Sequence, residues 1–227
     1  MKTKQILSLA AGILTGLAAA VLILSLLITT LGTSADTMLS VMRDTAPSES
    51  TGLPESAYEP VTQMICGYLS GSVETFQYEL TAEDGTVTPL FNEKEQTHMA
   101  DCRDLFTLCG TVTTAAVAVA AACMFVIYLL GEKRRAFKGL LIGCGIAVAL
   151  GAALAIAAAT NFNSVFIAFH RLFFTNDLWL MDRNTDLIIR LMPTAFFTRY
   201  ALMIGGGWLG LMVLLSAGTV LDLKREK

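Results

Sequence analysis

The chain has 227 residues, of which 54% are apolar, and a formal net charge of −3 at pH 7. Its mean hydropathy is +0.61, which is too high for an ordinary soluble domain. The balance of charge is weakly acidic, so nucleic acid is not an expected partner.

Four blocks without any charged residue dominate the chain. They cover residues 6–31, 105–130, 139–160 and 200–221. Each block exceeds the roughly 20 residues that a helix needs to cross the hydrocarbon core of a bilayer. A helix satisfies its own backbone hydrogen bonds there, so the blocks predict four transmembrane helices. The expected fold class is an all-α integral membrane protein with four transmembrane helices and a small α+β extracytoplasmic cap.

Charges between the blocks predict the orientation. Residues 1–5, 131–138 and 222–227 together hold nine cations and three acids, whereas 32–104 and 161–199 hold seven cations and sixteen acids. The positive-inside rule then places both termini and the basic loop in the cytoplasm. The expected location is the cell (plasma) membrane, with the two acidic segments outside.

The chain is therefore expected to divide into seven parts. These are the N-terminus with the first helix at 1–33, the cap at 34–104, the second helix at 105–130, the basic loop at 131–138, the third helix at 139–160, the outer aromatic segment at 161–199, and the last helix with the C-terminus at 200–227. The first apolar run is about twice as long as the core of a signal peptide, so we expect it to be retained. Small residues in the third block, including Gly143 and Gly151, and Gly206 and Gly210 in the fourth, are typical of closely packed helices.

The cap shows its own pattern. Residues 44–56 are polar and contain two prolines and a glycine, which favours a loop. Helical spacing of apolar residues over 58–69 predicts a helix that ends at Gly71. Residues 73–80 and 86–91 are typical of a small hairpin with an Asp84-Gly85 turn.

A histidine follows the hairpin at the start of a long helix. Asn92 and Glu95 have the spacing of a capping box, and the helix they begin runs through His98 into the second apolar block. Asp101 and Cys102 lie three and four residues later, on the same helix face. A carboxylate at that place can hold the imidazole in one tautomer. The alternative is an exposed surface histidine in a charged turn.

The second histidine lies within an aromatic segment. Seven of the twelve phenylalanines fall in 161–199, together with Trp179, and several recur at helical spacing. His170 follows Phe166 by four residues and precedes Phe174 by four, so it lies on the aromatic face. The alternative is an interfacial helix whose histidine simply reaches the polar headgroups.

These motifs resemble the lipoprotein intramolecular transacylase (Lit) family. The resemblance rests on NEKEQTHMADCRDLF, FNSVFIAFHRLFFTNDLWLMD and LIIRLMPTAFF, which lie within residues 91–106 and 162–197 and stand in the family's order along the helices. Cys102 departs from the pattern, since an aliphatic residue is more usual there, and Cys66 lies in the variable cap. A disulfide between these two cysteines, both on the oxidising side, is left open.

The resemblance implies an enzyme that moves the sn-2 acyl chain of a diacylglyceryl-cysteine lipoprotein to the cysteine α-amine, which gives an N-acylated lyso-form lipoprotein. It implies His98 and His170 as the catalytic pair. Supporting residues would be Asp101, Glu93, Arg171, Asn176 and Asp177. The substrate pocket would comprise Phe91, Phe166, Phe169, Phe173, Phe174, Trp179, Phe196 and Phe197. The expected partners are the diacylated lipoprotein and membrane lipids, with the protein acting as a monomer.

The chemistry agrees with these residue types. Exchange of an ester for an amide is downhill, and the sequence has no P-loop, dinucleotide fingerprint or HExxH motif, so neither a cofactor nor a metal is expected. An α-amine with a pKa of about 8 can give its proton to a histidine with a pKa of about 6.5 at modest cost. Which histidine is the base is left open.

Other classes of protein remain as alternatives. The first is a non-catalytic four-helix accessory or pH-sensing protein, which needs only the topology and a histidine. A zinc hydrolase would need three ligands such as His98, Asp101 and His170. Transport is disfavoured because no acid or base lies inside the apolar blocks.

Overall fold

The computed structural model describes residues 2–81 and 85–225. The chain forms two compact units. One contains the residues up to 28, 109–160 and those from 203 onward, and the other contains 29–108 and 161–202. Each unit is described below by itself.

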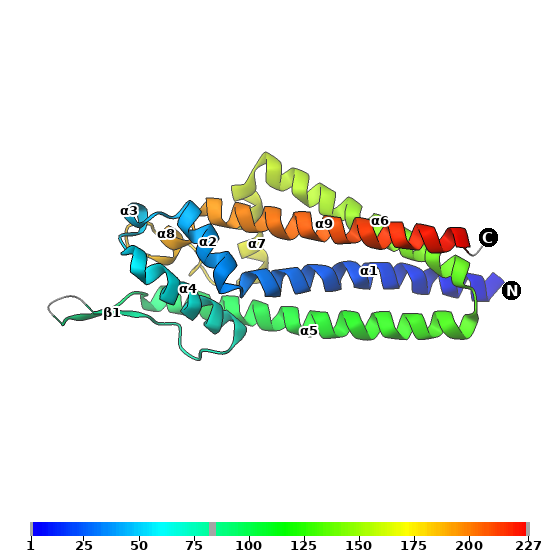
Figure 1. The fold of residues 1–227 in the computed structure, drawn as a ribbon, viewed down its shortest axis with the longest axis horizontal. Helices are drawn as coiled ribbons and strands as arrows, with labels where there is room; N and C mark the ends of the chain where they lie inside the picture. The colour runs from blue at the N-terminus through cyan, green and yellow to red at the C-terminus, as the bar shows by residue number, and fades with distance from the viewer. Residues whose placement is uncertain (1, 82–84, 226–227) are drawn as a thin grey trace. The chain divides into compact units, whose positions relative to one another are not determined.

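The four long helices confirm the membrane prediction. They are α1 (Lys2–Gly32), α5 (Glu93–Leu130), α6 (Lys133–Thr160) and α9 (Thr194–Arg225) (Figure 1). Within the described part of the chain, these four are the helices long and apolar enough to cross a membrane. Large apolar side chains such as Leu150 and Leu214 lie on the surface of these helices, as expected for helices that face lipid.

Two of these helices approach each other closely at glycines. A Cβ atom on Gly139 of α6 would overlap the backbone carbonyl of Leu9 in α1, and one on Gly12 would overlap the carbonyl of Ala136. Gly143 meets the backbone at Ile13 in the same way, as its spacing predicted. Without a hydrophobic driving force in lipid, such backbone contact supplies the van der Waals packing that holds helices together.

The fourth long helix packs differently from its prediction. The Trp208 ring of α9 fills the space that a side chain would need at Gly151, and its Nε1 donates to the carbonyl of Ala20 at 2.8 Å. Gly206 and Gly210, in contrast, have no described atom from another helix within 4 Å of a Cβ position, so their predicted packing role was wrong. A large aromatic side chain makes the contact in place of a small one.

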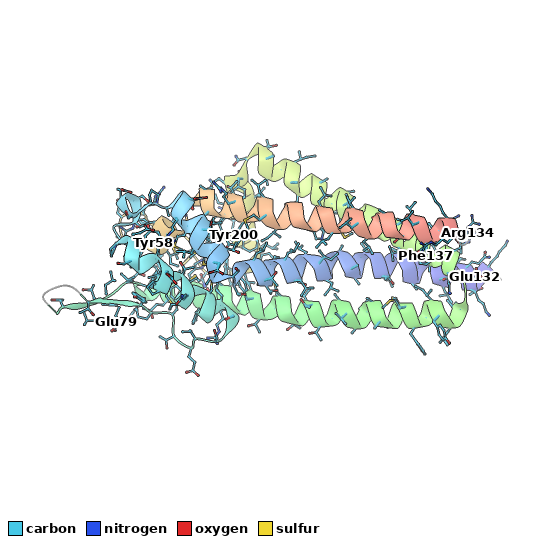
Figure 2. All side chains as sticks on the ribbon, in the orientation of Figure 1. Tyr58, Glu79, Glu132, Arg134, Phe137 and Tyr200 are labelled. Atoms are coloured by element: carbon cyan, nitrogen blue, oxygen red, sulfur yellow. The ribbon has the colours of Figure 1, made fainter. Side chains whose placement is uncertain are left out.

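The basic loop is much shorter than predicted. Gly131, with φ of 71°, ends α5, and α6 begins at Lys133, so most of 131–138 is helical. Figure 2 shows Glu132, Arg134 and Phe137 at this connection. Lys, Arg and Ala are good helix formers, so the helix continues past the apolar block. Helix α9 also begins before its predicted start at 200: its first residue is Thr194, directly after Pro193, and the Pro193 carbonyl accepts from the N–H of Phe196 at 2.9 Å.

The second unit contains the cap helices α2 (Ala35–Thr45), α3 (Ser48–Thr51) and α4 (Glu55–Ser70). Helix α4 confirms the predicted helix, and Gly71 ends it in the left-handed conformation, with φ of 82°. The predicted loop at 44–56 was partly wrong because Pro47 and Pro54 each precede a helix start, a position where proline is tolerated. Tyr58 (Figure 2) is fully buried among these helices and hydrogen-bonds Thr51 at 2.8 Å.

The hairpin is present but short. Strands β1 (Glu79–Thr81) and β2 (Val87–Pro89) pair antiparallel, with Leu80 opposite Thr88. Asp84 of the predicted turn lies outside the described residues. Residues 73–78 are not a strand, because the side chain of Gln77 takes the place of a backbone ladder by bonding both the N–H and the C=O of Phe91.

Two more helices complete this unit. Helix α7 (Phe162–Phe173) begins at Asn161, whose side chain accepts from the N–H of Ser164 at 3.0 Å. Residues 175–187 then form an irregular loop before the short helix α8 (Ile188–Leu191). This loop connects α7, which carries His170, to α8.

Candidate active site

A capping box fixes the start of the helix that carries His98. The Oδ1 of Asn92 accepts from the N–H of Glu95 at 3.0 Å, and Oε2 of Glu95 accepts from the N–H of Asn92 at 2.9 Å. This reciprocal pair confirms the sequence prediction. His98 follows within the first two turns of α5, in its charged part and before the apolar block at residue 105. Its side chain is 7% exposed, so it is not a surface histidine.

Helix α7 holds His170 in one tautomer. Its Nδ1 lies 2.7 Å from the backbone carbonyl of Phe166, one turn earlier. A carbonyl only accepts, so Nδ1 must carry a proton that it donates. In the neutral ring, Nε2 then has a free lone pair. His170 is also 7% exposed.

The two histidines meet inside an aromatic cluster. The centres of their rings lie 6.0 Å apart, and the ring planes are 28° apart. Phe174 contacts both rings, with ring-centre distances of 5.1 Å to His98 and 5.4 Å to His170. The ring centres of Phe166 and Trp179 lie 4.1 Å and 5.0 Å from that of His170. The structure therefore brings together residues that are 72 positions apart in the sequence.

Burial keeps both rings neutral. The pKa of His98 is lowered to about 4: burial is the main cause, the neighbouring His170 and Lys94 also lower it, and the charge of Asp101 raises it. Burial also lowers the pKa of His170, against the hydrogen bond to Phe166, which raises it. At neutral pH each ring thus has one N–H group and one lone pair.

The nitrogens of His98 have unequal surroundings. Nε2 lies 3.6 Å from the Sγ of Cys102, one turn later on α5. Nδ1 is buried and has no hydrogen-bond partner within residues 2–81 and 85–225. An unpaired buried nitrogen costs free energy unless a ligand or water satisfies it, so Nδ1 is a point where a substrate atom can bind.

Asp101 holds the loop after α7, and no hydrogen bond between its carboxylate and the imidazole of His98 is described. Its Oδ2 accepts from Nδ2 of Asn176 at 2.9 Å, whereas the sequence suggested a bond to His98. Asn176 in turn accepts from Nε1 of Trp179 through its backbone carbonyl at 2.9 Å. These two bonds connect the His98 helix to the indole that covers His170.

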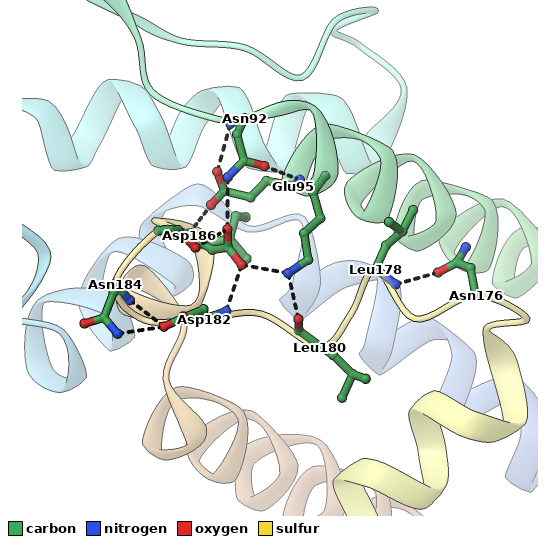
Figure 3. A network of polar contacts seen from close by, with 11 residues as sticks. Asn92, Glu95, Asn176, Leu178, Leu180, Asp182, Asn184 and Asp186 are labelled. Carbon is green, nitrogen blue, oxygen red and sulfur yellow. Dashed lines mark hydrogen bonds and ion pairs between the residues drawn. The ribbon is translucent and has the colours of Figure 1, made fainter.

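A second network anchors the same loop at Asp186 (Figure 3). This carboxylate is 2% exposed and accepts from Nδ2 of Asn92 at 3.0 Å, from Nζ of Lys94 at 3.0 Å and from the N–H of Asp182 at 2.8 Å. Lys94 also donates to the carbonyl of Leu180 at 2.7 Å. Burial raises the pKa of Asp186, but these hydrogen bonds together lower it by more, so it stays charged.

Glu95 belongs to this network as well. Besides the capping box, its Oε1 accepts from the N–H of Ile188 at 2.6 Å. Burial raises the pKa of Glu95 against the lowering effect of its backbone hydrogen bonds, and the charge of Asp186 adds to the rise. The sequence pattern indicates Glu95 only as a cap and does not indicate that Lys94 or Asp186 belongs to the site. The one available signal was the density of polar residues in NEKEQ, next to the predicted helix start.

The remaining predicted site residues lie in different places. Glu93, Arg171 and Asp177 are exposed. Phe91 packs on Phe76, with ring centres 4.7 Å apart, and makes no described ring contact with either histidine.

The other aromatic residues of the predicted pocket lie around the histidine cluster or beside it. Phe197 contacts Phe166 at 5.0 Å, and Phe196 contacts Tyr200 at 4.8 Å. Phe169, which is 5.4 Å from His170, and Phe173 are partly exposed on α7. Helix α7 therefore presents an open apolar face next to the buried pair.

The five cysteines are free thiols. Cys66 contacts the sulfur of Met38 at 3.7 Å, away from Cys102, which contacts His98. No group of three or more His, Cys, Asp or Glu within the described ranges is arranged to hold a metal ion. The expectation of metal-free chemistry remains a prediction.

Four long apolar helices and a buried, neutral histidine pair define a multi-pass membrane protein with a candidate acid–base site. The model of the family described as lipoprotein intramolecular transacylase Lit matches residues 13–197. The chain belongs to this family and is an acyltransferase. A comparison with curated proteins gave no match.

Solved structures share the fold. The membrane-integral lipoprotein intramolecular transacylase Lit from Bacillus cereus is 23% identical, with a TM-score of 0.60, and the match covers 100% of this chain and 98% of that one. A variant of the same protein with a histidine replaced by arginine is 20% identical, with a TM-score of 0.55, covering 100% and 94%. A variant with alanine at a histidine is 19% identical, with a TM-score of 0.62, covering 99% and 94%.

Proposed function

We propose that this enzyme moves the sn-2 acyl chain of a diacylglyceryl-cysteine lipoprotein to the α-amine of the same cysteine, with His98 and His170 as the acid–base pair. The product is an N-acylated lyso-form lipoprotein. The observation that carries the proposal is the contact of two buried, neutral imidazoles in a chain of this family. The pH-sensor alternative is not favoured, because the family is one of enzymes.

His170 is the better base of the pair. Its Nδ1–H is occupied by the Phe166 carbonyl, so the free lone pair on Nε2 is the group that accepts a proton. The α-ammonium of the substrate, with a pKa of about 8, transfers a proton to this nitrogen. The freed amine then attacks the ester carbonyl carbon.

The rest of the reaction needs a donor. Attack forms the C–N bond and puts a negative charge on the carbonyl oxygen, which an N–H group of His98 stabilises. The bond from carbon to the sn-2 oxygen then breaks as the attacking nitrogen loses a second proton, and the leaving oxygen takes one proton to become a hydroxyl. One ester and one ammonium group thus become one amide, one alcohol and one proton released to solvent, so no outside reagent is consumed.

The aromatic cluster supplies confinement. Donor ester and acceptor amine belong to one substrate, so holding both beside the histidines raises their effective concentration. Because each ring is 7% exposed, the substrate reaches them only when part of the aromatic cover moves. The partly exposed Phe169 and Phe173 offer an apolar surface to its acyl chains and to membrane lipids.

The activity is tested by mass spectrometry of a purified diacylated lipopeptide before and after incubation with the protein. The protein is used in detergent, as a monomer. We expect an unchanged total mass, with one acyl chain moved from glycerol to nitrogen in fragment spectra. The protein is first treated with a chelator and dialysed, and its rate should not fall. An unchanged acyl position would refute the transacylase proposal, and recovery only with zinc would favour a metallohydrolase.

The orientation is a further part of the proposal. Both termini and the α5–α6 connection lie in the cytoplasm, and the cap and histidines lie outside, on the strength of the charge distribution. Single cysteines replacing the exposed Ser50 and Arg134, in a chain whose native cysteines are replaced, test it. An impermeant thiol reagent added to intact cells should label position 50 and spare position 134. The reverse pattern would put the histidines on the cytoplasmic side.

A further inference from the structure

The thiol of Cys102 is placed against one nitrogen of the candidate catalytic pair. Cys102 and His98 are four residues apart on α5, which puts their side chains on one face, and Sγ lies 3.6 Å from Nε2. Nδ1 on the other side of the ring is buried and has no described partner. Nε2 of His98 thus contacts a protein side chain, whereas Nδ1 is available to a ligand.

We propose that Cys102 is a positioning residue: its thiol donates to Nε2 of His98 and so keeps the His98 proton on Nδ1, the nitrogen that is free for the substrate. The catalytic role of this hydrogen bond rests on the function proposed above. The position of the proton can, however, be measured without substrate.

The direction of this hydrogen bond follows from the two groups. A neutral imidazole nitrogen accepts well, whereas sulfur is a weak acceptor, so the S–H group is the better donor of the two. Burial, and after it the charge of Asp101, raise the pKa of Cys102 to about 12, so the sulfur keeps its proton. The carboxylate of Asp101 itself is bonded to Asn176 and does not compete for the ring.

The same facts argue against Cys102 as a nucleophile. A thiolate, not a thiol, attacks an acyl group, and a raised pKa removes the thiolate at neutral pH. A step through an acyl thioester would need the proton to move to His98, whose own pKa is lowered by burial. The raised pKa of Cys102 and the lowered pKa of His98 both favour a hydrogen bond in which the thiol keeps its proton.

The bond would make the two histidines complementary. His170 has its N–H bound to the Phe166 carbonyl and presents a lone pair. With its proton on Nδ1, His98 presents an N–H. If His98 instead held its proton on Nε2, both rings would present lone pairs, and neither could donate to the oxyanion.

The chain has only two histidines, which makes the proton position directly measurable. The full-length protein, purified through a tag without histidine and labelled with ¹⁵N-histidine, gives two rings in a nitrogen NMR spectrum. We expect His98 protonated at Nδ1 and unprotonated at Nε2. In Cys102→Ala the Nε2 signal of His98 should shift or split between tautomers, while the signals of His170 stay in place. Cys109→Ala, elsewhere on α5, is the matched control and should change neither ring.

Kinetics give an independent readout on the same variants. Loss of one positioning hydrogen bond should lower kcat of Cys102→Ala by about 5- to 30-fold with little change in KM. Cys102→Ser keeps a donor and should recover most of the rate, and Cys109→Ala should match the wild type.

Several results would overturn the inference. A proton on Nε2 of His98 in the wild type is sufficient by itself, even if Cys102→Ala fails to fold. Unchanged His98 signals in a folded Cys102→Ala variant would also refute it. Complete inactivity of both variants, with an acyl group bound to Cys102 in the wild type, would make the thiol a nucleophile. Failure of the wild type to convert any lipopeptide would refute the proposed function and leave the proton assignment standing.

Discussion

The imidazole rings of His98 and His170 lie 6.0 Å apart with nearly parallel planes, although one belongs to α5 and the other to α7. This distance allows both rings to contact one substrate centre. It also means that a change at one histidine alters the surroundings of the other, so the two should behave as a unit.

We expect the losses caused by His98→Ala and His170→Ala to be non-additive. Each single variant should lower the rate of lyso-lipopeptide formation by about 10²- to 10⁴-fold, and the rate of the double variant should be similar to that of the single variants. His170→Ala should be at least as damaging, because it removes the proposed base. Helix content by circular dichroism excludes unfolding as the cause. Near-normal turnover in either folded variant would remove that histidine from the mechanism.

The lowered pKa values predict acid sensitivity with a definite sign. His98 has a pKa of about 4 when folded and about 6.5 when unfolded, so the unfolded chain binds the proton more tightly. Stability is therefore full above pH 6.5 and falls as the pH drops towards 4, by about 3 kcal/mol at most from this residue. His170, facing it from α7, and Asp101 and Lys94 on α5 also act on this ring, and Cys102, whose thiol is 3.6 Å from Nε2, keeps its proton because burial raises its pKa.

Thermal unfolding in detergent between pH 4 and 8 tests this expectation. The wild type should lose stability across that window, and His98→Asn should lose markedly less. The activity of the wild type should show its acid limb below pH 6.5, because burial lowers the pKa of His170, the proposed base. An identical pH dependence of stability in the wild type and His98→Asn would contradict the burial of a neutral ring.

Those parts of the molecule that depend on residues close together in the chain could be predicted from the sequence. The membrane helices follow from uncharged runs, and the capping box of Asn92 and Glu95 follows from a spacing of three. The helical spacing of phenylalanines predicted α7 and placed His170 on its aromatic face. In each case the determining interaction lies within about one helical turn.

The hydrogen bonds that hold the site in place were harder to predict, because they join residues far apart in the sequence. Asn176 bonds Asp101 across 75 positions, and Asp186 bonds Asn92 across 94. On a single sequence, an acid in a polar loop has solvent as its default partner. Only the fold shows that Asp186 is buried and that Asp101 hydrogen-bonds Asn176 of the loop.

The buried pair of Lys94 and Asp186 should be important for both stability and rate. Asp186→Asn removes the carboxylate that holds Lys94, Asn92 and the N–H of Asp182. Breaking a buried pair on one side typically costs about 3 to 5 kcal/mol, less where one partner is partly exposed, as Lys94 is. We expect a lower unfolding temperature and, because the anchored loop carries Trp179, a lower kcat.

The exposed pair of Arg43 and Glu55 provides the matched control for Asp186→Asn. These side chains are 47% and 62% exposed, so Glu55→Gln should cost less than about 1 kcal/mol and leave the rate unchanged. Differential scanning fluorimetry and the lipopeptide assay measure both variants under the same conditions. Equal losses in the two variants would show that burial of Asp186 has no special effect.

The close contact of α1 and α6 gives the last prediction. Gly139 has no room for a side chain, because a Cβ atom there would overlap the Leu9 carbonyl, which belongs to rigid helical backbone. Gly139→Ala should therefore separate the two helices and lower the unfolding temperature in detergent. Gly145→Ala, on the same helix, is the matched control, since a Cβ at Gly145 meets no described atom within 4 Å. Alanine is the better helix former, by about 1 kcal/mol, so that variant should be as stable as the wild type or more so. If Gly139→Ala is as stable as Gly145→Ala, the two helices do not depend on backbone contact at this position.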